Sequence, residues 1–175
     1  MINRVIETMT QRLADTDKKG ALHSDIFIQA GTAHSAHYED GRIEELASSN
    51  ADGSGARIIV GDRTFYSHSP GTSPSAISRI LSEAESSAFG TLPDPPGNDR
   101  GPVLTMEEKM LPPDISYMKE LDLKIRKGSK YVRQVAFRYN ISKRNVLIIR
   151  SDGRCAEDSR TYCSFSAMVI AEKDG

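Results

Sequence analysis

Residues 38–70, YEDGRIEELASSNADGSGARIIVGDRTFYSHSP, decide the fold because strand-like runs alternate here with turn signals. The dipeptides Asp40-Gly41 and Gly61-Asp62 are typical of tight turns between antiparallel strands. The runs RIEELASS, ARIIV and TFYSH flank these turns, and a loop is predicted over residues 50–55. The glycines of that loop, NADGSGAR, are expected to serve turn geometry, because a phosphate loop would need a Lys-Ser/Thr pair and a following helix. The stretch therefore predicts consecutive antiparallel strands.

The neighbouring segments complete a first unit around these strands. The run DIFIQAGTAHSAHY, residues 25–38, predicts a long strand. A helix is expected before it from an apolar stripe at helical spacing, formed by Ile2, Val5, Ile6, Met9 and Leu13. A second helix is predicted after Ser73, its N-cap, with Pro74 as the first helical residue and Gly90 as its end. Its inward face is expected to hold Ile77, Ile80, Leu81 and Ala84.

A change of composition marks a boundary between two predicted domains. The run LPDPPGNDRGP, residues 92–102, holds four prolines and two glycines, which is typical of a linker. The sequence thus predicts an N-terminal α+β domain over residues 1–92, a Pro-rich linker over 93–113 and a partial middle α+β domain over 114–175.

The second domain is predicted to contain one helix and three antiparallel strands. Asp114 is the expected N-cap of the helix, which ends near Gly128. The strands are expected over YVRQVAFRY, NVLIIRS and TYCSFSAMVIA, with a turn at Asp152-Gly153. The predicted fold class is α+β, with two small units in the order α-ββββ-α and a truncated α-βββ. Because the last apolar strand runs into Asp174-Gly175, a hairpin signal, the chain is expected to be the front part of a longer protein.

Composition and charge narrow the class of protein. The chain has 175 residues, 38% of them hydrophobic and 27% charged, as in globular proteins. Its net charge of −1 favours neither a membrane surface nor nucleic acid, and the eleven Lys and Arg between residues 119 and 154 are expected to form a solvated face. No apolar block resembles a signal peptide or a transmembrane span. With two cysteines and no disulfide framework, the cytoplasm is the expected location.

The candidate metal ligands lie in unfavourable patterns. His34 and His37, in HSAHYED, would point to opposite faces of the predicted strand, so that both could not reach one ion. Cys155 and Cys163 are eight residues apart, with no CxxC motif and no neighbouring histidine. Neither an HExxH nor an HExxxH motif occurs in the chain. We therefore expect no catalytic, cofactor-binding or metal-binding residues in this chain.

Taken together, the order of these motifs resembles the TldD/PmbA family over about residues 20–175. The first half has a strand that ends in an acidic-Gly turn, then Gly53, Gly55 and Arg57 in a Gly-x-Gly-x-Arg pattern, a hairpin and an Ala-rich helix. The second half has an Ser-Asp-Gly turn, the segment Glu157-Asp158-Ser159-Arg160, and a strand that leads into AEKDG. This order and spacing is similar to the N-terminal domain and the middle region of that family.

The resemblance implies a family of cytoplasmic zinc metalloproteases, also described as modulators of DNA gyrase, which act on extended peptides. In the family, two histidines of an HExxxH helix and a distant cysteine hold the zinc, and the glutamate acts as general base. These residues would lie downstream of residue 175, so zinc is expected in full-length relatives and not in this chain. The resemblance also implies a homo-oligomer or a hetero-oligomer with a related subunit.

Three functions follow as hypotheses. The first is the non-catalytic N-terminal and central portion of a TldD/PmbA-type metallopeptidase that processes or degrades peptides, inactive on its own. The second is a stand-alone interaction module that binds a full-length relative or an extended peptide at a strand edge. The third, a nucleic-acid-associated regulator, is suggested only by the basic segment and the description of the family as modulators of DNA gyrase, and a nucleic-acid partner is not expected.

Overall fold

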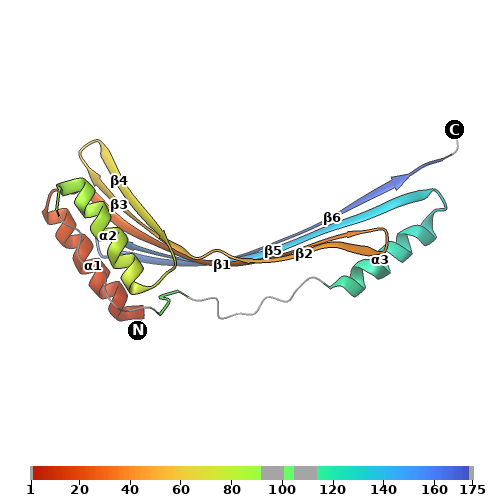
Figure 1. Ribbon diagram of the computed structural model, residues 1–175, viewed down its shortest axis with the longest axis horizontal. Helices are drawn as coiled ribbons and strands as arrows, with labels where there is room; N and C mark the ends of the chain where they lie inside the picture. Colours follow the sequence, from red (N-terminus) through yellow and green to blue (C-terminus); the bar gives the residue numbers. More distant parts are fainter. Residues whose placement is uncertain (1, 92–100, 105–113, 174–175) are drawn as a thin grey trace. The chain divides into compact units, whose positions relative to one another are not determined.

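The computed structural model describes residues 2–91, 101–104 and 114–173. Their elements are α1 (Ile2–Lys18), β1 (His23–Glu39), β2 (Arg42–Asn50), β3 (Gly53–Val60), β4 (Arg63–Pro70), α2 (Pro74–Phe89), α3 (Ile115–Gly128), β5 (Val132–Arg150) and β6 (Cys155–Ala171) (Figure 1). The strand order is β4-β3-β1-β5-β6, and β2 pairs with β1. The sheet is antiparallel, which confirms the predicted α+β class. In these described ranges, no helix is long and apolar enough to cross a bilayer.

The predicted hairpin turns are confirmed by backbone geometry. Asp40 and Gly41 have φ angles of 45° and 85°, Gly61 has 60° and Gly153 has 80°. These left-handed conformations suit glycine, which has no Cβ atom to clash, and are tolerated by aspartate. The strands that meet at these turns are therefore held in hairpin registers such as Glu39 opposite Arg42 and Val60 opposite Arg63.

One strand differs from the sequence prediction. Residues 132–150 form the single strand β5, whereas two strands were expected over YVRQVAFRY and NVLIIRS. The second part of the chain is thus α-ββ, and the predicted order α-βββ is wrong in this count. Because β5 lies between β1 and β6, neighbours on both sides pair with its backbone. These ladders keep the polar run Asn140–Arg144 extended, although its composition alone favours a break.

The chain divides into two compact units that are discontinuous in sequence. The first holds the residues up to Gly31, those from Ala51 through the described residues 101–104, and Arg144–Ser159. The second holds Thr32–Asn50, the residues from α3 to Lys143, and those from Arg160 onward. These compact units are not the predicted sequence ranges 1–92 and 114–175. The division of the sequence into those two domains stays a prediction. The predicted linker, 93–113, falls mostly outside the described residues.

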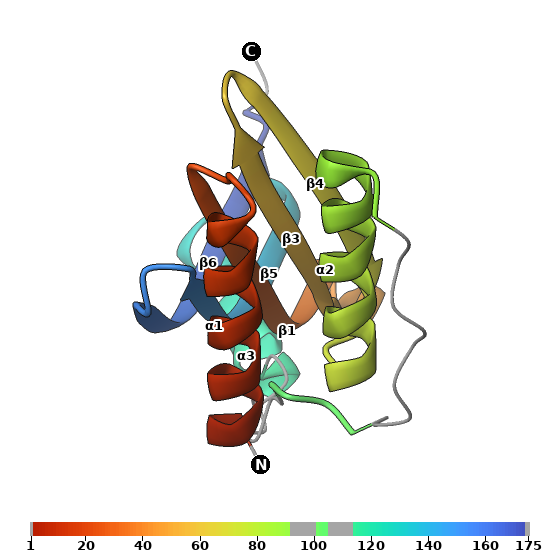
Figure 2. The same cartoon turned by 90° about the vertical axis from the view of Figure 1, so that its left-hand side faces the viewer.

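The first unit packs two helices on one face of its strands. Figures 1 and 2 show α1 and α2 side by side against β1 and β3. Ser73 accepts a hydrogen bond from the Ala76 N–H as N-cap, Pro74 begins α2 and Gly90 ends it with φ 70°, as predicted. The buried core consists of Met9, Leu13, Ile26, Ile28, Ala56, Ile58, Ile77, Ile80, Leu81, Ala84, Leu147 and Ile149.

A polar network joins the two helices of this unit. The Glu85 carboxylate, 8% exposed, accepts hydrogen bonds from Thr16 Oγ1 at 2.8 Å and from Arg12 Nη2 at 3.2 Å. The Lys19 ammonium lies 3.3 Å from the same carboxylate. A buried carboxylate is tolerated only with such partners, so the network fixes how α1 lies on α2.

The second unit has its own small core under α3. Asp114 caps α3 by accepting from the N–H groups of Ser116 and Tyr117, as predicted. Tyr38, 1% exposed, stacks on Phe137 with ring centroids 5.5 Å apart and donates a hydrogen bond to Asp122 of α3 at 2.9 Å. The cluster of buried residues is Ala36, Tyr38, Met118, Val135 and Phe137.

Candidate functional site

Strand β6 is, like β2, exposed along its whole length, and it is the longer of these two strands. It is the last strand in the order β4-β3-β1-β5-β6, and all 17 of its residues are exposed. Large apolar side chains are among them, each between 43% and 52% exposed: Tyr162, Phe165, Met168, Val169 and Ile170. A strand with this composition normally lies against another element, so β6 is the leading candidate for a binding surface.

The backbone of β6 alternates between its neighbour β5 and its outer edge. At one end, Arg150 N–H donates to Arg154 C=O at 2.9 Å, and at the other Glu172 N–H donates to Tyr131 C=O at 2.9 Å. Residues 154 and 172 are both even-numbered, so a regular alternation within β6 directs its even-numbered residues towards β5. By this alternation the odd-numbered residues 161–171 direct their N–H and C=O groups to the outer edge, where no described strand pairs with them.

Little in the sequence of this edge opposes pairing. Between residues 160 and 171 the only charged residue is Arg160, and there is no proline. Natural edge strands are usually protected by charges, prolines, bulges or a covering element. An edge strand with few charges and no proline can add an extended polypeptide through main-chain hydrogen bonds.

The two faces of β6 differ in their surroundings. Phe165 stacks on Phe137 with centroids 5.5 Å apart, so the odd-numbered side chains lie on the face that carries the core under α3. On the opposite face, Ser164 accepts a hydrogen bond from Asn140 Nδ2 at 3.4 Å. Tyr162, Met168 and Ile170 share this second face by the alternation of a strand. Residue 162 was not singled out from sequence, although its alternation with Met168 and Ile170 carries the signal.

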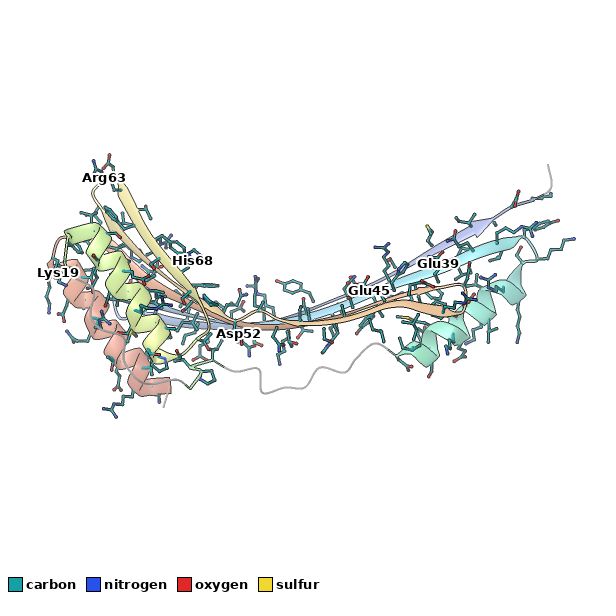
Figure 3. All side chains as sticks on the ribbon, in the orientation of Figure 1. Lys19, Glu39, Glu45, Asp52, Arg63 and His68 are labelled. Atoms are coloured by element: carbon teal, nitrogen blue, oxygen red, sulfur yellow. The ribbon has the colours of Figure 1, made fainter. Side chains whose placement is uncertain are left out.

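The histidines examined as metal ligands are placed apart, as the strand prediction implies. His34 Nδ1 lies 2.7 Å from Ser48 Oγ, while His37 Nε2 lies 3.7 Å from Glu39 Oε2, and both histidines belong to β1. At a spacing of three on a strand they point to opposite faces. Glu39 at the end of β1 and Glu45 of β2, which lies opposite His37, are labelled in Figure 3.

The two cysteines are exposed, unpaired residues of β6. Desolvation raises the pKa of Cys155, and the neighbouring Glu157 carboxylate adds to this shift, so its thiol stays protonated near neutral pH. Eight residues along a strand span about 27 Å, so Cys155 and Cys163 cannot hold one ion together. Among residues 2–91, 101–104 and 114–173, no three His, Cys, Asp or Glu side chains form a group suited to a metal. The residues described here therefore do not fit the zinc site that the family resemblance implies.

The Gly-x-Gly-x-Arg segment has a structural role that differs from the one expected. Gly53 and Gly55 lie within β3 and not in a turn, which corrects the predicted loop over 50–55. A Cβ atom on Gly55 would come within 2.5 Å of the Tyr66 hydroxyl, so glycine makes room for that ring. Arg57 donates through Nε to Asp25 at 3.1 Å. The pattern thus shapes the β1-β3-β4 face and offers no phosphate loop.

Side chains next to this segment form a small aromatic group. Tyr66 stacks on His68, a β4 residue visible in Figure 3, with centroids 5.7 Å apart. At the start of β6, the predicted Glu157–Arg160 segment is exposed, and Ser159 Oγ donates to Asn145 Oδ1 at 2.7 Å. The Tyr66–His68 stack and the Ser159–Asn145 hydrogen bond both lie within the first unit, whereas Arg160 belongs to the second. Neither contact brings a nucleophile next to a base.

Comparison with solved structures places the fold among known ones. TldE from Thermococcus kodakarensis aligns with a TM-score of 0.64 at 15% identity, over 94% of this chain and 39% of that one. A candidate modulator of a DNA gyrase from Thermotoga maritima aligns with a TM-score of 0.64 at 14% identity, over 97% and 40%. A candidate modulator of DNA gyrase from Bacteroides thetaiotaomicron gives 0.56 at 15% identity, over 97% and 42%. The chain thus spans about two fifths of the length of these proteins.

Comparison with protein-family models identifies the family of this chain. A search of curated proteins gave no match. The family model of PmbA/TldA metallopeptidase domain 1 matches residues 24–88, and that of the PmbA/TldA metallopeptidase central domain matches residues 104–175. Together these matches cover more than half of the sequence, in the order that the motifs predicted, and the chain therefore belongs to the PmbA/TldD metallopeptidase family.

Proposed function

We propose that this chain is the non-catalytic N-terminal and central portion of a peptide-processing metallopeptidase of the PmbA/TldD family. Its role in this proposal is to hold an extended polypeptide at the outer edge of β6. The sequence contains no HExxxH motif, and the family match covers domain 1 and the central domain. Zinc chemistry is assigned to full-length relatives and not to residues of this chain. The unpaired state of Cys155 and Cys163 supports a reducing compartment, the cytoplasm.

The observation that carries the proposal is that, among the described residues, no strand pairs with the outer edge of β6. Odd-numbered residues 161–171 present N–H and C=O groups outward, and apolar side chains flank them on both faces. An unfolded peptide can satisfy these groups by adding as one more antiparallel or parallel strand, whereas a folded protein has few free strands to offer. Because the bonds are made by the main chain, such an edge would bind peptides according to their extended conformation more than according to their amino-acid sequence.

A proline at an outward-facing position tests this role. Ala167→Pro removes one outward N–H while leaving the hydrogen bonds to β5, and edge strands tolerate proline at such positions. Ala167→Ser is the matched control because it keeps the N–H. The probe is a fluorescently labelled protein that is kept unfolded by reduction and carboxymethylation, and binding is measured by anisotropy at low and high salt.

The expected result is that the wild type and Ala167→Ser bind the unfolded probe, with little dependence on salt, and that Ala167→Pro does not. Circular dichroism and thermal unfolding check that the proline variant is folded. Equal binding by Ala167→Pro, or equal binding of the same protein in its native form, contradicts the proposal. A steep loss of binding with salt indicates a charged ligand such as nucleic acid instead.

A further inference from the structure

We propose that the first unit binds the bases of a single-stranded nucleic acid on a row of three exposed rings, Phe27, Tyr66 and His68. These residues come from strands β1 and β4 and belong to one compact unit. None of them lies in β6, so the row is independent of the proposed peptide edge.

The row lies on the face of the sheet opposite α1 and α2 (Figure 2). The neighbouring even-numbered residues of β1 and β3 point into the core under these helices: Ile26, Ile28, Ala56 and Ile58. Because side chains alternate along a strand, Phe27 and Gly55 point to the other face. Phe27 is the cross-strand partner of Gly55, which is in turn the partner of His68. These three positions therefore form one line across β1, β3 and β4, and Tyr66 shares their face because it lies two residues from His68.

Gly55 lets the rings form a continuous surface. A Cβ atom at this position would lie 2.5 Å from the Tyr66 hydroxyl and 3.1 Å from two carbon atoms of its ring. The far end of the Tyr66 ring therefore lies above Gly55, the position between His68 and Phe27 in the line. The centroids of the Tyr66 and His68 rings are 5.7 Å apart, and their planes differ by 19°. Tyr66 is 62% exposed, so the row presents nearly parallel rings to solvent.

A fixed guanidinium group lies beside the row. Arg57 is the cross-strand partner of Tyr66, so both side chains lie on the same face of the sheet. Arg57 Nε donates to the Asp25 carboxylate at 3.1 Å, and Nη2 donates to the same carboxylate. Asp25 is buried and lies 2.9 Å from His23 Nε2, so the protein holds the carboxylate in place. The Arg57 side chain, 48% exposed, therefore offers a guanidinium plane of fixed orientation, on which a base can stack.

Unpaired nucleobases are the planar ligands that fit such a surface. Single strands are bound by stacking successive bases on aromatic rings and arginine planes that are displayed on a sheet. Three rings and one guanidinium plane offer room for several consecutive bases, which favours a strand over a single nucleotide. In a duplex the bases are paired and stacked on one another, and extruding them costs free energy. The row is therefore assigned to a single strand.

Stacking, and not charge, supplies the affinity in this assignment. The chain has a net charge of −1, and the charge of Arg57 is balanced by Asp25. Few phosphates are therefore neutralised, and binding is expected to depend only weakly on salt. The low charge of the chain argues against binding driven by phosphate contacts, which is a different mode of recognition.

Two glycine substitutions in β3 test the row. The probe is a fluorescently labelled oligothymidylate, and its binding to the full chain is measured by anisotropy. Gly55→Ala places a methyl group against the Tyr66 hydroxyl, so the exposed ring must move, and the affinity is expected to fall about tenfold. Gly53→Ala is the matched control on the same strand and face, because its Cβ atom would lie 3.4 Å from the Ser69 carbonyl oxygen, an ordinary contact.

Substitutions of Tyr66 test the same geometry from the other side. Gly55→Ala/Tyr66→Phe lacks the hydroxyl that would approach the new methyl group most closely, so its affinity is expected to recover towards that of Tyr66→Phe alone. Tyr66→Ala is expected to lose about tenfold in affinity, whereas Tyr117→Ala, at a tyrosine of α3 that is 55% exposed, retains binding. Thermal unfolding checks the fold, and Gly55→Ala is expected to be at least as stable as the wild type, because alanine loses less backbone entropy than glycine in a strand.

Several outcomes overturn the assignment. It is wrong if the single strand does not bind at high micromolar concentration of the chain, or if a duplex of the same length binds equally well. Equal affinities of Gly55→Ala and Gly53→Ala, or a double variant that does not recover, contradict the role of the Tyr66 ring. If Gly55→Ala weakens binding of the unfolded carboxymethylated protein instead, the row is a peptide surface. Ala167→Pro, which tests the proposed function, is expected to leave binding of the oligothymidylate unchanged.

Discussion

Removal of one hydroxyl group, by Tyr38→Phe, tests how the second unit is held together. Tyr38 is 1% exposed, and its hydroxyl donates to Asp122 Oδ2 at 2.9 Å. Asp122, 4% exposed, also accepts from Arg126 Nε at 2.7 Å, so its carboxylate keeps one strong partner in the variant. A buried hydrogen bond to a charged group contributes about 1.5–3 kcal/mol, and we expect Tyr38→Phe to lower the free energy of unfolding by about 2 kcal/mol.

The titration of Tyr38 makes this difference in stability depend on pH. Burial, followed by the hydrogen bond to Asp122 and the negative charge of that residue, raises the pKa of Tyr38 to about 12 from an ordinary value near 10. Because the pKa is raised in the folded state, the neutral phenol is favoured there. Its contribution to stability is complete below pH 10 and is lost as the pH rises through 12. Two pKa units correspond to at most about 2.7 kcal/mol, and because desolvation is the largest cause, the hydrogen bond to Asp122 accounts for only part of this value.

Urea unfolding of the wild type and Tyr38→Phe, followed by circular dichroism between pH 7 and pH 11.5, measures both quantities. The difference in free energy of unfolding is expected to be constant up to about pH 10 and to shrink above it. Taking the difference cancels the titration of other tyrosines and lysines. A difference below about 0.5 kcal/mol at pH 7, or one that does not change with pH, refutes the assigned role of the Tyr38 hydroxyl.

Three further outcomes follow from the described contacts. Glu85→Ala removes the buried carboxylate that accepts from Thr16 and Arg12 and is expected to cost about 2–3 kcal/mol in chemical unfolding, whereas Glu83→Ala, which removes a 40% exposed carboxylate that accepts from Ser67, is expected to cost less. Asp114→Ala removes the N-cap of α3 and is expected to cost about 1 kcal/mol, while Asp114→Ser restores most of it. The purified chain is expected to hold no stoichiometric zinc and to cleave no peptide, and zinc that is lost on replacing His34 and His37 by alanine contradicts this.

Much of the local structure could be predicted from sequence because its causes are local. The turn at Asp40-Gly41, the cap at Ser73 and the end of α2 at Gly90 depend on backbone preferences of those residues. The apolar stripe of α1 likewise places Met9 and Leu13 in the core. Such features need no knowledge of the rest of the fold.

The remaining features depend on contacts that are distant in sequence. The bond between Tyr38 and Asp122 joins residues 84 positions apart, and no pattern in either segment indicates the other. The grouping of Thr32–Asn50 with α3 follows from such contacts, so it could not be read from a linear domain boundary. Similarly, β5 stays extended through Asn140–Arg144 because β1 and β6 pair with it on both sides.

Only part of the candidate site could be predicted from the sequence. The apolar run after Cys163 indicated a strand in need of a partner. Which backbone groups face outward depends on the phase of pairing with β5, which is set by contacts such as Glu172 with Tyr131. The structure supplies that phase, and with it the distinction between odd-numbered and even-numbered residues on which the proposed edge depends.

Amide hydrogen exchange along β6 tests the central claim, that this edge holds an extended polypeptide, most directly. The measurement compares the chain with and without the carboxymethylated unfolded probe and resolves single amides by NMR. The amides of Phe165, Ala167 and Val169 are expected to exchange fast in the free chain and slowly with the probe, while those of Ser164, Ser166 and Met168 are protected in both states by β5. Odd-numbered amides that stay unprotected while the probe is bound contradict the account.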